Sequence, residues 1–247
     1  MTHRFAPFAI ALTLVLAACG TTGDDESGDT TTTTEAKESS TTSETTASTT
    51  TEPEVDEEAQ ARAEAVEVTL DDFPDGWESS PHEVDEDEDL ITQCSEFDLE
   101  ELSLGVYNTD DFSIGDLSAN DGQSMQLGTR VFEDEETATS ILDVMPTDDF
   151  IACANQELEA NFGEGSVEGA VEARQFEGIG DQTEGFSGQL EVADSATGET
   201  VTLQVAFVAI RTGDLVTGLT AVGVGQLLDT DVLDDLGDRI VELQEGV

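Results

Sequence analysis

Apolar and polar residues alternate in the middle of the chain, from Met125 to Phe132, with the period of a half-buried strand. Just after this stretch, Asp134 has the chemistry of a helix N-cap and Pro146 that of a helix stop. Between them the apolar residues follow the spacing of one helix face, at Ala138, Ile141, Leu142 and Met145. The pattern therefore predicts a strand followed by an amphipathic helix.

The C-terminal half has the pattern of strands joined by short turns. Strands are predicted over Val167–Phe176, Phe186–Val192, Val201–Ile210 and Leu215–Val222. The Val201–Ile210 segment is the most apolar and is expected at the centre of the sheet. Residues 194–198 are expected to form a hairpin turn. An amphipathic helix over Thr230–Leu243 closes the chain.

Further helices are predicted over 57–67, Leu99–Leu104 and 148–161. Between the first two, Pro74 and Gly76 force a turn that places Phe73 and Trp77 as core anchors. Helices followed by strands with short connections predict an α+β fold, an antiparallel sheet with helices packed on it. We expect one such domain, spanning residues 56–247.

The N-terminus has the pattern of an export signal over residues 1–18, with Arg4 before a short apolar stretch. This stretch is too short for a transmembrane helix. It ends in Leu16-Ala17-Ala18-Cys19, which resembles the lipobox of bacterial lipoproteins, where the cysteine receives the lipid. We expect acyl chains such as palmitate on Cys19 to anchor the protein on the outer face of the cell membrane. The alternative is a secretory signal with an incidental cysteine.

Residues 19–55 are rich in Thr and acidic side chains and hold almost no apolar residue larger than Ala. Such a segment cannot bury enough surface to offset its ordering entropy, so a disordered linker is expected. The Thr30–Thr34 run is either glycosylated or a plain polar spacer.

The chain has 58 acidic and 7 basic residues, a net charge of −51, and Lys37 is its only lysine. This charge excludes nucleic acid as a partner, because phosphate binding needs clustered Lys and Arg. Most of the acids lie in the domain and few in the linker. A surface kept soluble in high salt is the preferred explanation, and a cation-collecting surface is the alternative.

Two cysteines remain in the expected domain, Cys94 and Cys153. In an exported protein they are expected to form a disulfide. A metal site or catalytic thiol has no support, because no His adjoins either cysteine and no Cys-x-x-Cys occurs. No cofactor is expected.

We find no convincing catalytic set. His82 is read as a surface histidine, since no G-x-S-x-G nucleophile turn is present. The Asp85-x-Asp87-x-Asp89 spacing resembles part of a calcium loop but has Leu90 where a glycine is needed. Loose binding of divalent cations by the acidic surface stays open, and the many carboxylates prevent the exclusion of a glycosidase pair.

Arginines are scarce, so their positions are informative. Arg130 on the predicted strand and Arg211 at the end of the most apolar strand are candidates to bind an anionic ligand in a cleft. Pairing with one of the many carboxylates is the ordinary alternative. Trp77 is a third candidate for ligand binding, beside its interpretation as a core anchor.

Several segments, in this order and spacing, resemble an actinobacterial family of PknH-like extracellular sensor domains. They are the lipobox and Thr-rich linker, residues 73–77, Cys94, residues 129–134, residues 150–153, residues 178–181 and residues 208–214. The family occurs on receptor Ser/Thr kinases and on free lipoproteins. The resemblance implies a non-catalytic, ligand-sensing α+β module with a cleft. Related domains often have two disulfides, whereas this chain can form one.

The sequence therefore predicts a membrane-anchored extracytoplasmic module that binds a small molecule or an envelope component. A carrier of lipids or glycolipids is the second hypothesis, and an envelope hydrolase is the third. A sensor should have a modest cleft of mixed polarity, and a carrier a long apolar cavity. An enzyme should have buried carboxylates with perturbed pKa values.

Overall fold

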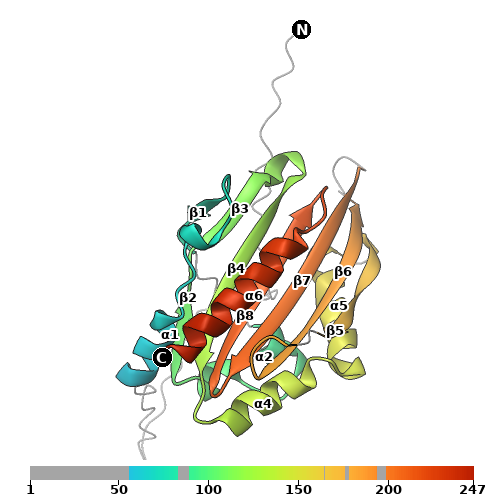
Figure 1. Cartoon of the computed structure of the whole chain (residues 1–247). Coiled ribbons are helices and arrows are strands. Elements are labelled where there is room, and N and C mark those ends of the chain that lie inside the picture. The colour runs from blue at the N-terminus through green and yellow to red at the C-terminus, as the bar shows by residue number, and fades with distance from the viewer. Residues whose placement is uncertain (1–55, 83–88, 164, 176–177, 194–198) are drawn as a thin grey trace, which may run out of the picture. The chain divides into compact units, whose positions relative to one another are not determined.

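The computed structural model describes residues 56–82, 89–163, 165–175, 178–193 and 199–247. The predicted signal peptide, the lipidation site Cys19, the linker, the 194–198 turn and two of the calcium-loop residues, Asp85 and Asp87, lie outside these ranges. The described residues form an eight-stranded antiparallel sheet with helices on both faces (Figure 1). The predicted α+β class is confirmed.

The sheet has the strand order β1-β3-β4-β8-β7-β6-β5, and β2 pairs with β4 beside β3. The strands are β1 Glu78–Ser80, β2 Gly105–Asn108, β3 Asp111–Asp116, β4 Asp121–Val131, β5 Val167–Gln175, β6 Gln182–Ala193, β7 Thr200–Thr212 and β8 Leu215–Val224. The most apolar strand, β7, is interior as expected, but β8 occupies the middle of the sheet. The chain thus adds its last two strands between earlier ones.

Six α-helices surround the sheet, and the described residues contain no helix long and apolar enough to span a membrane. They are α1 Glu57–Ala65, α2 Leu90–Cys94, α3 Leu99–Leu102, α4 Glu135–Val144, α5 Asp148–Phe162 and α6 Thr230–Glu245. An oxygen-bearing side chain caps each N-terminus, as at Asp134 for α4 and Thr147 for α5. These caps explain why the starts of α4 and α5 were predictable.

The register divides the strand residues between two layers. Met125 and Leu127 of β4 and Leu219 of β8 pack with α6 on one side, which we call the α6 face. The intervening residues point to the other side, where α2, α3, α4 and α5 lie; we call it the α4–α5 face (Figure 1). The sheet therefore has a core on each side.

Two strands that the sequence pattern did not reveal, β2 and β3, run consecutively along the edge of β4. Asn108 pairs with Gly128 and Phe112 with Met125, so three residues of one strand face two of the other. This extra residue is a β-bulge at Thr109–Asp110. The bulge breaks the alternation that would have marked a strand.

Side chains of two helices form hydrogen bonds with backbone groups on both edges of the sheet. The Gln60 amide of α1 donates to the Val106 carbonyl at 3.0 Å and accepts from the Val106 N–H at 3.1 Å. The Asn155 amide of α5 makes the same pair of bonds with Val171, at 3.1 and 2.8 Å. Edge groups that are already bonded cannot recruit another strand.

The predicted disulfide is present, with Cys94 of α2 bonded to Cys153 of α5. The two core anchors are also where they were expected. Phe73 stacks on Phe112 with ring centroids 4.3 Å apart, and Trp77 packs against Phe73 at 4.9 Å. All three belong to the core of the α6 face.

Candidate functional site

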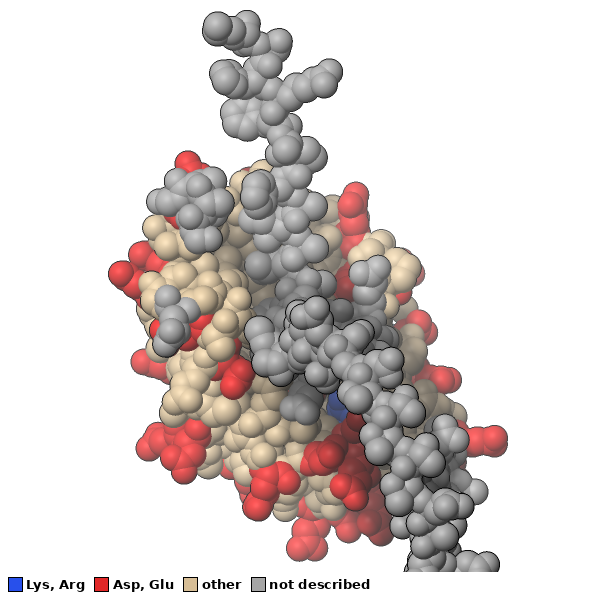
Figure 2. All heavy atoms as spheres, turned by 180° about the vertical axis from the view of Figure 1, so that it is seen from behind, with Lys and Arg blue, Asp and Glu red and all other residues tan. Residues whose placement is uncertain are grey.

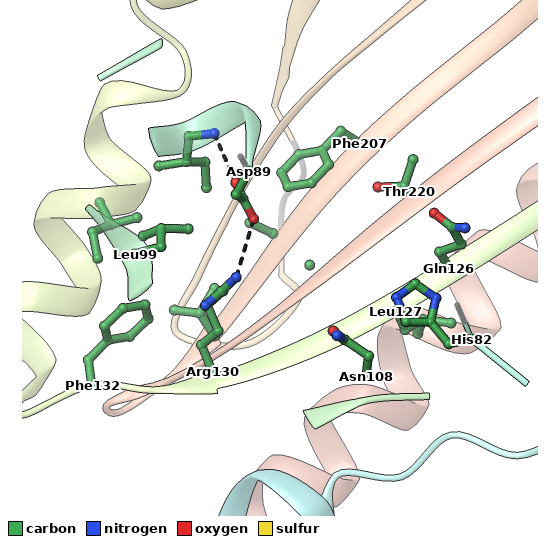
Figure 3. A pocket seen from close by; sticks show the side chains of 16 residues that line it. His82, Asp89, Leu99, Asn108, Gln126, Leu127, Arg130, Phe132, Phe207 and Thr220 are labelled. Carbon is green, nitrogen blue, oxygen red and sulfur yellow. Dashed lines mark hydrogen bonds and ion pairs between the residues drawn. The ribbon is translucent and has the colours of Figure 1, made fainter. Parts of the chain in front are cut away.

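A cleft opens on the α4–α5 face, between the sheet and the helices α2, α3 and α5. It consists of two adjoining cavities of about 220 Å³ each. Both are lined by the same four residues at their junction: Asp89, Gln126, Phe207 and Thr220. Figure 3 shows how Phe207, Thr220 and Gln126 line the sheet side of the first cavity.

Small residues on three neighbouring strands form the floor of the first cavity. Gly128 of β4 pairs with Gly218 of β8, which pairs with Ala209 of β7. Larger side chains flank this row on both sides: Arg130 and Val216 lie on one side, and Gln126, Thr220 and Phe207 lie on the other. The hollow therefore results from three small residues that the register aligns.

Arg130 lies at the polar end of the cleft. Its guanidinium donates to Ser103 Oγ at 3.3 Å and lies 3.6 Å from Asp89 Oδ2. Asp89 also caps α2, because its Oδ1 accepts from the Ile91 N–H at 2.9 Å (Figure 3). One carboxylate thus links the start of α2 to strand β4.

Other polar groups line the same cavity. They are the side chains of His82, Asn108, Gln126 and Thr220, from β4, β8 and the edge segments. His82 Nδ1 lies 2.8 Å from Asp111 Oδ1, so a carboxylate holds the imidazole at the edge of the cleft. The side chains of the first cavity can accordingly both donate hydrogen bonds to a ligand and accept them from it.

The second cavity is more apolar. Phe186 of β6 stacks on Phe207 of β7 with centroids 5.4 Å apart, and Val205 and Val222 continue the surface. Leu158, Asn161 and Glu157 of α5 form the facing wall. Asn161 Nδ2 is buried and has no hydrogen-bond partner among the described residues. The cleft thus changes from polar to apolar along its length.

The disulfide explains how the short helix α2 can form a wall. Five residues are too few for a stable isolated helix. Here α2 is fixed at its C-terminal end by Cys94–Cys153 and at its N-terminal end by the Asp89 contacts. Ile91 of α2 is 5% exposed and belongs to the core of the α4–α5 face.

Of the three predicted ligand-binding residues, only Arg130 lines the cleft. Arg211 is 5% exposed and bonds to the Gly213 carbonyl at 2.9 Å and to Glu135 Oε1 at 3.2 Å. It fits the ordinary alternative of a paired arginine at the end of a hairpin. Trp77 is buried on the α6 face, where it acts as a core anchor.

The charge around the cleft is strongly negative. Acidic side chains stand around the margin of the face seen in Figure 2, and basic atoms are visible near its centre. Among the described residues, no group of three or more His, Cys, Asp or Glu is arranged to hold a metal ion. Burial raises the pKa of Glu184, near Asp143, but Glu184 does not line either cavity.

Sequence reasoning missed most of the cleft. The Gln126, Gly128 and Arg130 positions were recognised as the polar side of a strand, which suggests solvent. Helices cover both faces of this sheet, so polar residues on an interior strand indicate a cleft. Gly218, inside a predicted strand, was the signal that could have shown the hollow floor.

Comparison with known proteins returns few matches. The chain matches no known family profile and no curated protein sequence. Among solved structures it is similar to the extracellular domain of PknH from Mycobacterium tuberculosis, with 10% identity and a TM-score of 0.30. That match covers 57% of this chain and 66% of the other.

A second solved structure is LpqN, described as involved in cell envelope biogenesis of Mycobacterium tuberculosis. It has 14% identity and a TM-score of 0.31, over 68% of this chain and 77% of the other. The family that the sequence motifs resemble is thus among the matches. Both TM-scores are below 0.5, so the function proposed below is drawn from this chain's own residues.

Proposed function

We propose that this protein is a non-catalytic binding module of the extracytoplasmic side of the membrane, with the cleft of the α4–α5 face as its ligand site. The observation that carries the proposal is the cleft itself, modest in size and polar at one end. Small-molecule sites have this character, a largely apolar hollow with a few placed polar groups.

The lining supports binding more than catalysis. The residues that line the two cavities include neither Ser nor Cys, the usual acyl-transfer nucleophiles. Asp89 is engaged by α2 and Arg130, and His82 by Asp111. These contacts position walls of the cleft.

Two features support an extracytoplasmic location. The Cys94–Cys153 disulfide suits an oxidising compartment. The lipobox-like Leu16-Ala17-Ala18-Cys19 indicates a lipid anchor on Cys19, and the linker after it would hold the domain away from the membrane. We propose this anchor as the protein's membrane attachment.

The test is native mass spectrometry of the full chain carrying Cys19→Ser, purified without detergent from an envelope extract of its source. A bound small molecule that is released on unfolding would support the proposal. A bound lipid with long acyl chains would favour the carrier hypothesis, and turnover of an envelope component would favour a hydrolase.

The matched variant Gly218→Leu places a side chain on the cavity floor. A Cβ there would lie 3.5 Å from the Phe207 ring, an ordinary contact, so the fold should tolerate it. We expect Gly218→Leu to abolish ligand retention. Thr202→Val, an exposed β7 residue outside the cleft, should retain the ligand. Equal retention by both variants would contradict the proposed site.

A further inference from the structure

Two hydrogen-bond donors of the cleft have bonding capacity left for a ligand. A guanidinium has five N–H donors. Among the described residues, Arg130 makes a hydrogen bond of 3.3 Å to Ser103 and an ion pair of 3.6 Å to Asp89. Asn161 Nδ2 in the second cavity is a buried donor without a partner. A ligand group that meets the Arg130 guanidinium must bring acceptor oxygens.

Arg130 differs from the other ion-paired arginines. Arg62 makes a bidentate pair with Asp214, at 2.6 and 2.8 Å, and Arg239 donates to Asp72 Oδ1 at 2.9 Å. Arg211 donates to Glu135 Oε1 at 3.2 Å and to the Gly213 carbonyl at 2.9 Å. Carboxylate–guanidinium bonds of full strength are about 2.7–2.9 Å long. The 3.6 Å contact of Arg130 with Asp89 is therefore loose, although the molecule has many carboxylates that could bind the guanidinium tightly.

Asp89, in contrast, has both oxygens engaged. Oδ1 accepts from the Ile91 N–H and Oδ2 faces Arg130. A cationic ligand would have to share this carboxylate with Arg130 and would be repelled by the guanidinium. An anionic ligand would replace Asp89 at Arg130, while Asp89 would keep its hydrogen bond to the Ile91 N–H of α2.

We propose, on the basis of the function proposed above, that the ligand is an amphiphile with an anionic group, a carboxylate or phosphate. Arg130 binds the anionic group, and the Phe186–Phe207 cavity receives the apolar part. Asp89 is paired with the Arg130 guanidinium when the cleft is empty, so it competes with the ligand for that group. Ligand binding exchanges one carboxylate partner of Arg130 for an anion from outside.

The test is isothermal titration of the full chain carrying Cys19→Ser with four probes: octanoate, octyl phosphate, 1-octanol and inorganic phosphate. We expect both anionic amphiphiles to bind about tenfold more tightly than 1-octanol, the order expected of a charged hydrogen bond. Inorganic phosphate should bind more weakly than octyl phosphate. Equal affinity for inorganic phosphate and octyl phosphate would contradict an amphiphilic ligand, because the apolar cavity would then contribute nothing to the affinity.

Arg130→Gln should remove the preference for octanoate over 1-octanol, whereas Arg239→Gln on α6 should leave it unchanged. Asp89→Asn should tighten octanoate binding about threefold to fivefold, the order of a released exposed ion pair. Asn is also a good N-cap, so α2 should remain in place. Asp98→Asn is the matched control, because Asp98 caps α3, carries the same charge and does not line the cleft.

Equal binding of octanoate by wild type and Arg130→Gln would overturn the proposal, as would a lack of binding by the wild type. Suppose that Arg130→Gln binds octanoate as tightly as wild type does, but Gly218→Leu prevents octanoate binding. The proposed cleft is then the binding site, and only the proposed ligand chemistry is wrong. If Gly218→Leu also leaves binding unchanged, both proposals fail.

Discussion

Thr217 and Thr220 lie three residues apart on β8 and face opposite sides of the sheet. Thr217 is 1% exposed, and its hydroxyl is hydrogen-bonded to Thr129 Oγ1 and Gln244 Nε2, both at 2.9 Å. Thr220 lines the cleft and is half-buried. One strand thus contributes a bonded core residue to the α6 face and a ligand-facing residue to the α4–α5 face.

The difference follows from how each face is covered. A single long helix, α6, lies along its face (Figure 1). Its residues Leu236 and Ile240 are almost fully buried. The α4–α5 face is covered by several helices, of which α2 and α3 are short, and the sheet beneath them is partly built from glycine. A continuous helix closes a face, whereas separate helices over small residues leave a cleft.

The largest predicted effect concerns the covalent link on the open face. Replacing both Cys94 and Cys153 by Ala should lower the free energy of unfolding by about 4 kcal/mol, from the chain entropy of the loop that the disulfide closes. Denaturant unfolding measures the loss. Hydrogen exchange should also increase in α2 before it increases in β4 or β8. Unchanged exchange in α2 would show that the helix needs no covalent anchor.

A core truncation on the closed face should come next. Leu236→Ala removes a side chain that is 1% exposed between α6 and the sheet. We expect a loss of about 3 kcal/mol, within the range for buried leucines. Chemical denaturation tests it, with Leu227→Ala, at a residue 71% exposed, as the control. A loss below 1 kcal/mol would mean that α6 is less well packed than the burial indicates.

The sharpest test of the comparison is one substitution made on both faces. Thr217→Val should lower the free energy of unfolding by about 2 kcal/mol, because the buried Thr129 hydroxyl and the Gln244 amide each lose a hydrogen-bond partner. Thr220→Val should change stability by less than about 0.5 kcal/mol, as usual for sites outside the core. Thermal unfolding of the two variants gives the contrast. Equal costs would remove the distinction between the faces.

The smallest effect is expected at the end of the sheet, where Arg62 of α1 pairs with Asp214 after β7. Hydrogen bonds from Arg62 lower the pKa of Asp214. A carboxyl with a lowered folded-state pKa stabilises the fold above its unfolded pKa, and this stability disappears as pH falls through the folded value. Arg62→Gln should therefore cost about 1 kcal/mol at neutral pH, the upper range for a partly exposed pair.

Unfolding curves recorded as a function of pH check this prediction. The difference between wild type and Arg62→Gln should shrink as the pH falls below about 4, the ordinary range of an Asp carboxyl. A difference that is constant with pH would assign the effect to packing of the arginine stem instead. Asp214→Asn should show the same pH dependence.

The helices and long strands could be predicted from sequence because their signals are local. The Asp134 cap, the following apolar spacing and the Pro146 stop lie within one segment and give α4 almost to the residue. The strands β2 and β3 were missed because their bulge breaks the alternation and their pairing depends on β4. Helix α2 was missed because its disulfide and Asp89 contacts hold it, not its own propensity.

By itself the sequence determined the α+β class, the pairing of the only two cysteines in the domain, and Arg130 as a candidate ligand residue. Each depends on local periodicity, on counting, or on the scarcity of a residue type. Only the tertiary structure decided that Gly128, Gly218 and Ala209 align into one floor, that Arg130 faces Asp89 there, and that Arg211 and Trp77 lie elsewhere. Strand order and register set these neighbours, and they depend on contacts between residues far apart in the chain.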